Sequence, residues 1–305
     1  MQFPVGFFFE PVWGKDIHCH AFVKSMQYLL AQSKWQRAAR MKYRTIFLSD
    51  IHLGTPGCQA DLLLDFLKSH EAETYYLVGD IVDAWRIRRK GFLWPQAHND
   101  VVQTLLAKAH GGARIYFIPG NHDEFLRSYY GTHFGGIEVV ASATFTAGDG
   151  KRYLVTHGDQ FDAVVTNAKW LAHLGDQAYE FMLWLNTRLN RLRHLWGGQY
   201  WSLSKWAKHQ VKQAVNFISE YENVLTAEAR RGGYNGVICG HIHSAAIRDM
   251  DGVAYVNTGD WVESCTAVVE RADGSLALID WERSARRSRH RARRAQRKEK
   301  TLENV

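Results

Sequence analysis

The chain has 305 residues, a formal net charge of +7 and 46% hydrophobic residues, enough for one large globular domain or two small ones. Charges interrupt its apolar stretches well before the ~20 residues that a membrane-spanning helix needs. The four cysteines (Cys19, Cys58, Cys239 and Cys265) form no CxxC pair, which argues against a zinc ribbon or a disulfide scaffold and fits a reducing compartment.

The first 40 residues show no clear hydrophobic periodicity, and a strand-like pattern starts directly after Met41. We interpret residues 1–40 as an N-terminal extension of uncertain role, with Met26 and Met41 as alternative starts. The extension lacks the basic start, the continuous apolar segment and the cleavage site of a signal peptide. We therefore expect a cytoplasmic protein.

From Met41 onward, short apolar runs rich in β-forming residues alternate with helical stretches. Helical patterns cover residues 59–70 and 97–110, between the first three runs. The alternation predicts an α/β domain over residues 41–283, and the strand-rich second half predicts a second sheet packed on the first. The expected strands are 45–49, 74–79, 113–120, 152–158, 235–240, 253–259, 265–270 and 276–281.

One block, about residues 162–231, contains no strand candidate. Its apolar residues from Trp170 to Leu185 recur at helical spacing, which predicts several helices inserted between two strands. Further along the block, Lys205, Lys208 and Lys212 fall at i, i+3 and i+7 and share one face of a helix. Such a stripe is typical of a solvated helix, but these lysines would also suit contact with a ligand that carries phosphate groups and an apolar chain.

The positive charge is concentrated at the end of the chain. Residues 283–305 hold ten Lys or Arg and two Glu, so their net charge of +8 leaves the remaining residues at −1. We predict that residues 284–305 form a disordered basic tail, because they have almost no apolar residues. Three interpretations stay open: the tail binds anionic phospholipid, it binds nucleic acid, or it is solvated without a specific partner.

Metal-binding residue types follow five of the expected strands. A single Asp at such a place is typically a helix cap, and a single His is typically a structural residue. Five strand ends in succession, usually beside a glycine, instead indicate a ligand site at the carboxyl edge of the sheets. The candidate ligands are Asp50, His52, Asp80, Asn121, His157, His241 and His243.

Seven candidate ligands are too many for one ion and suit two divalent ions that share a carboxylate. The mixture of nitrogen and oxygen donors without thiolate suits Mn²⁺, Fe²⁺ or Zn²⁺, with Mn²⁺ the first choice and Mg²⁺ a further candidate. At the first motif, Asp50 and His52 are two residues apart, so in an extended segment both side chains would point to one side. Two such ions would activate a shared water for attack on a phosphorus atom.

The motifs DxH, GDxxD, GNHD, HGD and GHxH, in this order, resemble the calcineurin-like metallophosphoesterases over roughly residues 43–282. The resemblance implies a four-layer α/β sandwich, with two mixed β-sheets flanked by helices, and a metal-dependent phosphoesterase or pyrophosphatase activity. It also implies that Asp50, His52, Asp80 and His243 hold one ion. The second ion would be held by Asp80, Asn121, His157 and His241, with Asp80 as the bridging and catalytic carboxylate.

Within this superfamily the chain most resembles the UDP-2,3-diacylglucosamine hydrolases of lipid A synthesis, on the stretches "SDIHLG", "GNHDEFL" and "THGD" before a helical block. The resemblance implies cleavage of a lipid-linked nucleotide pyrophosphate to UMP and 2,3-diacylglucosamine 1-phosphate under a helical lid. It also implies a peripheral location on the inner face of the cytoplasmic membrane, which the basic tail would suit. His122 departs from the pattern, because the typical member has Arg there.

His122 is therefore a candidate both to contact the substrate and to protonate a leaving oxygen, and the alternative is a supporting residue behind the ligands. Asn121 is a second candidate for substrate contact. We expect Asp83 and Asp123 to orient the histidines. Asp159 is expected either to do the same or to cap a helix.

Two other functions remain in view. The first is another phosphoesterase, acting on a nucleotide, a phospholipid or a nucleic acid, and His122 favours an ordinary phosphodiester or monoester. The near-neutral body argues against nucleic acid, because proteins that track its backbone carry basic grooves. The second is an interaction scaffold without metals, which the complete set of seven candidate ligands argues against.

Overall fold

The computed structural model describes residues 41–89, 92, 94–162 and 203–284, without the side chains of residues 203–214. The predicted extension 1–40, most of the predicted insertion and the predicted tail beyond Ser284 lie outside the described residues. None of the described helices is both long enough and apolar enough to cross a membrane.

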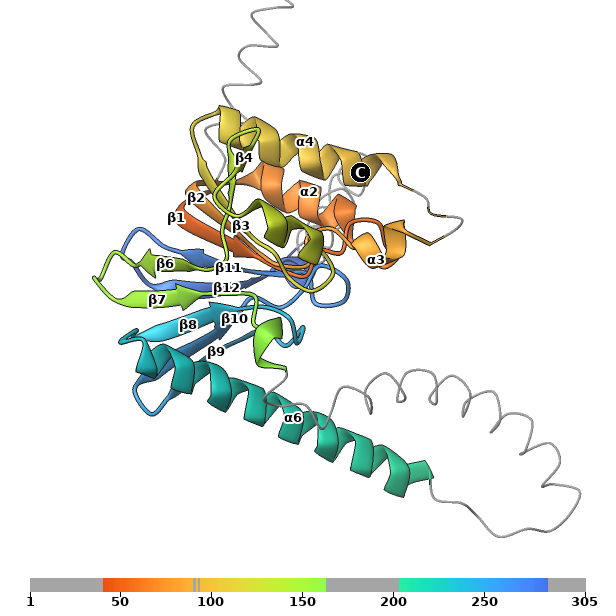
Figure 1. The fold of residues 1–305 in the computed structure, drawn as a ribbon, viewed down its shortest axis with the longest axis vertical. Coiled ribbons are helices and arrows are strands. Elements are labelled where there is room, and N and C mark those ends of the chain that lie inside the picture. Colours follow the sequence, from red (N-terminus) through yellow and green to blue (C-terminus); the bar gives the residue numbers. More distant parts are fainter. Residues whose placement is uncertain (1–40, 90–91, 93, 163–202, 285–305) are drawn as a thin grey trace, which may run out of the picture. The chain divides into compact units, whose positions relative to one another are not determined.

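Two mixed β-sheets lie face to face in the described part of the chain (Figure 1). The seven-stranded sheet has the order β12-β11-β1-β2-β3-β5-β4. Its strands are β1 (Met41–Leu48), β2 (His70–Val78), β3 (Arg114–Ile118), β4 (His133–Phe134), β5 (Ile137–Val139), β11 (Thr266–Glu270) and β12 (Leu276–Asp280). The five-stranded sheet, in the order β6-β7-β8-β10-β9, consists of β6 (Ala143–Thr146), β7 (Arg152–Val155), β8 (Gly236–Cys239), β9 (Ala246–Met250) and β10 (Val253–Asn257).

Helices cover the outer faces of the two sheets (Figure 1). On the larger sheet, α2 (Ala60–Ser69) buries Ala60, Leu63, Leu64 and Leu67, which share one helical face, and α4 (Gln96–His110) packs beside it. On the smaller sheet, α6 (Leu203–Arg231) buries Tyr221, Leu225 and Ala229 against β8 and β10. The short helices are α3 (Ala84–Ile87), η1 (Glu124–Tyr129) and η2 (Asp159–Phe161).

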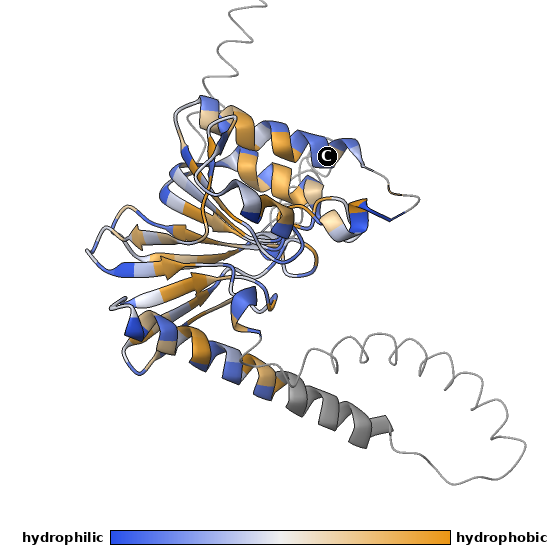
Figure 2. Cartoon of the chain, viewed as in Figure 1, coloured by the Kyte–Doolittle hydropathy of each residue, from blue (hydrophilic) through white to orange (hydrophobic). Residues whose placement is uncertain are grey.

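The central core lies between the sheets and is rich in aromatic side chains. Phe47 of β1 is fully buried and stacks on Tyr76 of β2, with ring centroids 5.0 Å apart. Its edge also meets Phe145 of β6 in the opposite sheet, again at 5.0 Å. Hydrophobic residues follow the strands and the covered face of α2 (Figure 2), so burial of these surfaces holds the layers together.

The predicted α/β sandwich is confirmed, and each of the eight expected strands and both expected helices matches an element of the structure. The prediction missed β4, β5, β6 and β9. The first two have only two and three residues, β6 buries only Phe145, and β9 exposes the polar centre of its sequence at a sheet edge, so none has a buried apolar run. The helical lid was predicted over about residues 162–231. Of this range, the structure describes residue 162 and α6, and the rest lies outside the described residues.

Because Phe47 joins the two sheets, Phe47→Ala should lower the free energy of unfolding by about 3–5 kcal/mol. Phe134→Ala is the matched control, since Phe134 on β4 is 48% exposed, and it should change stability by about 0.5 kcal/mol. Urea denaturation of the three proteins measures both values. Equal losses in the two variants would contradict this description of the core.

Candidate metal centre

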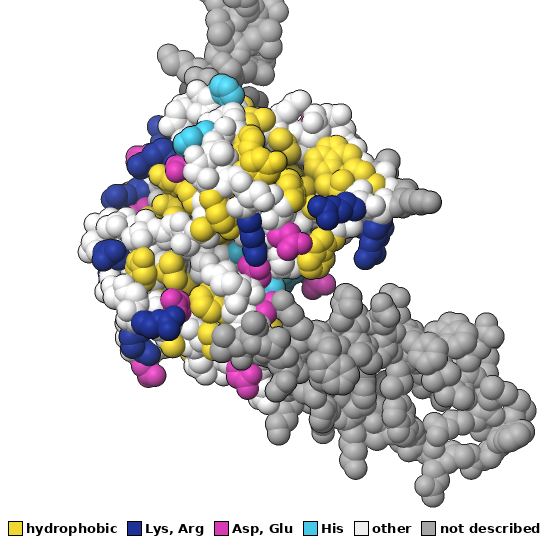
Figure 3. Space-filling model, in the orientation of Figure 1, with side chains coloured by type: hydrophobic (Ala, Val, Ile, Leu, Met, Phe, Trp, Pro, Cys, Tyr) yellow, Lys and Arg dark blue, Asp and Glu magenta, His cyan; other side chains and the backbone are white. Residues whose placement is uncertain are grey.

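The five motifs converge at the carboxyl ends of β1, β2, β3, β7 and β8, where the chain leaves both sheets at one edge of the sandwich. Histidine and acidic side chains meet near the middle of the face shown in Figure 3. Their donor atoms form three overlapping groups, each within 4.8 Å: Asp50, His52 and His243; His52, Asp80 and His122; Asp80, His157 and His241.

A left-handed backbone places several of these side chains. Asp50, His52, Asp80, His241 and His243 have φ between 50° and 71°. This conformation is uncommon for residues with a Cβ and costs of order 1–3 kcal/mol where it is strained, so it is typical of functional sites. The expectation that Asp50 and His52 share one side of an extended segment is therefore wrong. They reach one group because both residues turn out of the strand direction.

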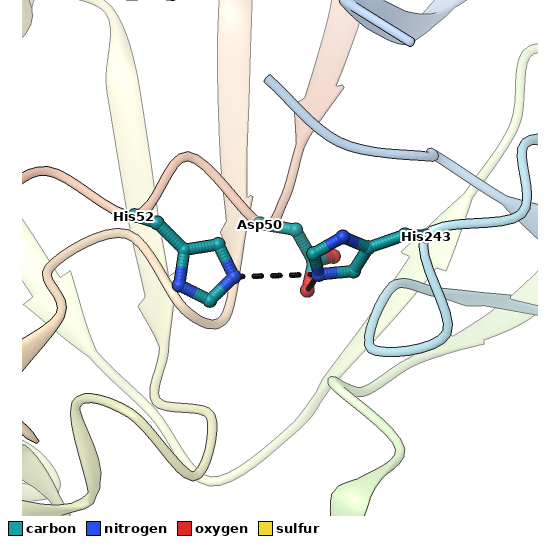
Figure 4. A group of neighbouring side chains, drawn as sticks. All are labelled: Asp50, His52 and His243. Atoms are coloured by element: carbon teal, nitrogen blue, oxygen red, sulfur yellow. Dashed lines mark hydrogen bonds and ion pairs between the residues drawn. The ribbon is translucent and has the colours of Figure 1, made fainter. Parts of the chain in front are cut away.

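The first group joins the end of β1 to the loop after β8 (Figure 4). Nε2 of His243 lies 3.2 Å from Oδ1 of Asp50 and 3.3 Å from Nε2 of His52. The other carboxylate oxygen of Asp50 accepts hydrogen bonds from the Ser49 hydroxyl and from the backbone N–H of His241. These bonds fix the carboxylate, so Oδ1 stays directed toward the two imidazoles.

Asp80 connects the groups. Its Oδ1 accepts the backbone N–H of His122 at 2.8 Å. Its Oδ2 lies 3.5 Å from Nε2 of His157, 3.9 Å from Nε2 of His52 and 4.0 Å from Nε2 of His122. One buried carboxylate oxygen thus faces three imidazoles from three different strand ends.

Several buried ligand atoms make no hydrogen bond. These are Oδ1 of Asp50, Oδ1 of Asn121 and Nε2 of His157, within the described part of the chain. Leaving a buried polar atom without a hydrogen bond costs about 1–3 kcal/mol, and these atoms are oxygen and nitrogen ligands of the kind that bind divalent ions. The donor set therefore fits the metal ions expected from the sequence.

Gly120 shows how tightly the group is packed. A Cβ on Gly120 would lie 2.2 Å from Oδ1 of Asp80 and 2.6 Å from Nε2 of His157, far inside contact distance. Glycine at this position lets the end of β3 approach both side chains. The glycine of the GNHD motif is thus required because a larger residue would clash with Asp80 and His157.

The electrostatic balance of the site favours positive charge. Burial alone would lower the pKa of His157, but the carboxylates of Asp80 and Asp50 outweigh it and raise the pKa to about 10. Burial and the neighbouring charge of Asp80 raise the pKa of Asp123 to about 6. The carboxylates that attract a proton to His157 would equally attract a cation to its neutral nitrogen.

The three supporting carboxylates have different contacts. Oδ2 of Asp83 lies 3.1 Å from Nδ1 of His122 and 3.6 Å from Nδ1 of His52, and its Oδ1 caps α3. The Asp123 carboxylate accepts backbone N–H groups of Gly120, Ile81 and their neighbours, and thus joins the loops after β2 and β3.

Asp159 is engaged by an arginine. Its Oδ2 accepts a hydrogen bond from Arg127 at 2.6 Å, and its Oδ1 makes no hydrogen bond within the described part of the chain. The contacts observed for Asp123 and Asp159 are thus to backbone and to arginine, whereas the sequence suggested histidine or a helix end. Asp83 stands beside two histidines, and its predicted role in orienting them stays a prediction.

Two further residues of the site escaped the sequence analysis. Trp85, which is 45% exposed, lies against His122 with ring centroids 4.2 Å apart. The Asp162 carboxylate contacts Nε2 of His241. Trp85 follows the GDxxD motif and Asp162 follows HGD by three residues, but neither belongs to a recognised pattern. Lys205, Lys208 and Lys212 lie in α6, and their side chains are outside the described part.

Several known proteins are similar to this chain. A UDP-2,3-diacylglucosamine hydrolase of Xanthomonas campestris is 28% identical over 252 residues, which cover 77% of this chain and 97% of that protein. The DNA polymerase II small subunit of Methanothermobacter thermautotrophicus is 26% identical over 72% of this chain and 47% of its own length. Among solved structures, the phosphoesterase Yfce from E. coli aligns over 77% of this chain and 98% of its own, with a TM-score of 0.38 and 16% identity.

The family model described as calcineurin-like phosphoesterase matches residues 43–245, which span all five motifs and the whole candidate metal centre. This match covers more than half of the chain. Named hydrolases among the relatives support the same activity class. The chain belongs to the calcineurin-like phosphoesterase family and is a metal-dependent hydrolase.

Proposed function

We propose that two divalent ions, Mn²⁺ first among them, bind at the two ends of the cluster. Asp50, His52, Asp80 and His243 would hold one ion, and Asp80, Asn121, His157 and His241 the other. The position of Asp80 in two of the three donor groups carries this assignment, because a shared carboxylate is what a two-ion site requires. The buried atoms of Asp50, Asn121 and His157 that make no hydrogen bond in the described part of the chain support it.

We propose further that the substrate is a lipid-linked nucleotide, UDP-2,3-diacylglucosamine, hydrolysed to UMP and 2,3-diacylglucosamine 1-phosphate. The printed function of relatives that align over most of this chain supports this choice. When bound, two divalent ions supply an activated water and positive charge for the phosphoryl oxygens. The residues of the chain have to place the phosphate and the leaving group beside them, which are the roles proposed for Asn121 and His122.

His122 is held on three sides. Asp83 lies 3.1 Å from its Nδ1, Trp85 covers one ring face, and His52 meets it edge-on with ring centroids 4.6 Å apart. The remaining ring nitrogen, Nε2, lies 4.0 Å from Oδ2 of Asp80 and thus faces the cluster. A ring fixed in this way would present Nε2 to a phosphate oxygen.

This arrangement also supports a second candidate function. A histidine can protonate a leaving alkoxide, which the cleavage of an ordinary phosphodiester requires, whereas a pyrophosphate expels a phosphate that leaves readily without an acid. Hydrolysis of another phosphodiester or of a phosphomonoester is therefore the alternative. The similarity to a DNA polymerase subunit keeps nucleic acid within that alternative.

For location, we propose that the enzyme is cytoplasmic and binds the inner face of the cytoplasmic membrane through its basic tail. Residues 283–305 carry a net charge of +8, and each basic residue near an anionic leaflet contributes about 1 kcal/mol. The lipid substrate proposed here would be presented at that surface. The lysines of α6 are proposed to contact its phosphates.

Metal binding can be tested apart from activity. Titration of metal-free protein with Mn²⁺ should show two sites, and Mn²⁺ at 100 times its Kd should stabilise the fold by about 2.7 kcal/mol per site. Asp80→Asn should lose both sites because it removes the shared carboxylate, whereas His241→Ala should lose one. The control is Asp65→Asn, which replaces an exposed carboxylate on α2. Two intact sites in Asp80→Asn would contradict the assignment.

The substrate is tested by comparing Mn²⁺-dependent UMP release from UDP-2,3-diacylglucosamine with hydrolysis of a simple phosphodiester. We expect efficient UMP release, lost in Asp80→Ala and His241→Ala variants whose circular dichroism is unchanged. Assays with Mg²⁺ and Zn²⁺ in parallel identify the effective ion. Rapid phosphodiester cleavage without UMP release would contradict the lipid substrate and favour the alternative.

The role of His122 separates the two functions. If it acts as a general acid, His122→Ala should lower kcat for an alkyl phosphodiester by about 10²- to 10⁴-fold and affect pyrophosphate cleavage much less. His133→Ala, at an exposed histidine of β4, is the control. Equal losses on both substrates would instead assign His122 to phosphate binding.

A further inference from the structure

Asp162 contacts the candidate centre from a place that none of the five motifs includes. It follows η2 directly and is only 3% exposed. Both of its carboxylate oxygens lie 2.8 Å from Nε2 of His241. An ionised carboxylate accepts hydrogen bonds and cannot donate them. With Asp162 ionised, the proton in this contact is therefore on Nε2 of His241.

The burial of the Asp162 carboxylate makes its contact with His241 energetically important. An ionised carboxylate removed from water is strongly destabilised unless it is paired or hydrogen-bonded. The ring that it meets is already positioned by other contacts, because the backbone N–H of His241 donates to Asp50 and its ring meets the edge of His157. The additional effect of Asp162 is therefore to determine which nitrogen of the His241 ring carries the proton.

His157 shows the same arrangement with the nitrogens exchanged. Its Nδ1 donates to the carbonyl of Val78 at 2.9 Å, and its buried Nε2 makes no hydrogen bond among the described residues and lies 3.5 Å from Oδ2 of Asp80. In each histidine, one ring nitrogen contacts an oxygen and the other ring nitrogen remains available to bind an ion; both residues belong to the donor group of Asp80. A histidine that binds a metal ion commonly donates its second N–H to a carboxylate or a carbonyl, which fixes the tautomer.

We propose that Asp162 is a positioning residue of the second ion site: its carboxylate keeps the proton of His241 on Nε2 and thereby leaves Nδ1 as the nitrogen that binds the ion. Asp162 also places a carboxylate behind the imidazole, the usual partner of a histidine that binds a metal ion. The inference rests on the proposed ion sites and is independent of the proposed substrate.

Two variants test it by Mn²⁺ titration of the full-length protein. Asp162→Ala should weaken the second site roughly 10- to 100-fold and leave the first site unchanged. Asp162→Asn keeps an acceptor oxygen and should therefore bind more tightly than Asp162→Ala. Gln160→Ala, which removes a hydrogen bond of η2 to Thr156 without touching His241, is the matched control and should bind like the wild type.

A spectroscopic measurement separates positioning from a merely structural ion pair. In Zn²⁺-loaded protein labelled with ¹⁵N-histidine, long-range ¹H–¹⁵N spectra should show His241 protonated on Nε2 and ligated through Nδ1. His241→Ala assigns the signals, and Asp162→Ala should lose this pattern. Ligation through Nε2, or a second site in Asp162→Ala as tight as in the wild type, would overturn the proposal. Absence of a second site in the wild type would instead contradict the two-ion assignment itself.

Discussion

The carboxylate of Asp80 is the interaction on which the centre depends. One of its oxygens is fixed by a backbone N–H, and the other faces imidazoles from the ends of three strands at 3.5–4.0 Å. None of these three imidazoles is close enough for a short hydrogen bond to that oxygen. A buried charge held at such distances is poorly compensated by protein groups alone, and a divalent ion between the donors would compensate it.

The two-sheet fold brings these charged and polar groups together and holds them in place. Two sheets end at one edge, so carboxylates and imidazoles that are far apart in sequence meet there. The turns at this edge have strict backbone requirements. Residues such as Asp80 and His241 adopt the costly left-handed conformation, and position 120 has no room for a Cβ, so it requires glycine. The aromatic core around Phe47 holds the sheets rigidly enough to maintain these conformations.

Much of this could be predicted because the relevant information is local. Each buried strand is an apolar run, and each motif directly follows one, so strand ends and candidate ligands are visible together in the sequence. The edge strands β4 and β9 lack such runs. The contact between Asp162 and His241 joins residues 79 positions apart, and the bonds of Asp123 go to backbone N–H groups. Neither feature leaves a pattern in the sequence, because both depend on how the two sheets meet.

The most direct test of a two-ion centre organised by Asp80 is a crystal structure of the Mn²⁺-loaded protein with anomalous diffraction data. The account predicts two anomalous peaks on opposite sides of the Asp80 carboxylate, about 3.5–4 Å apart. One peak should contact Asp50, His52 and His243, and the other Asn121, His157 and His241. A single peak, or two peaks that do not share Asp80, would contradict it.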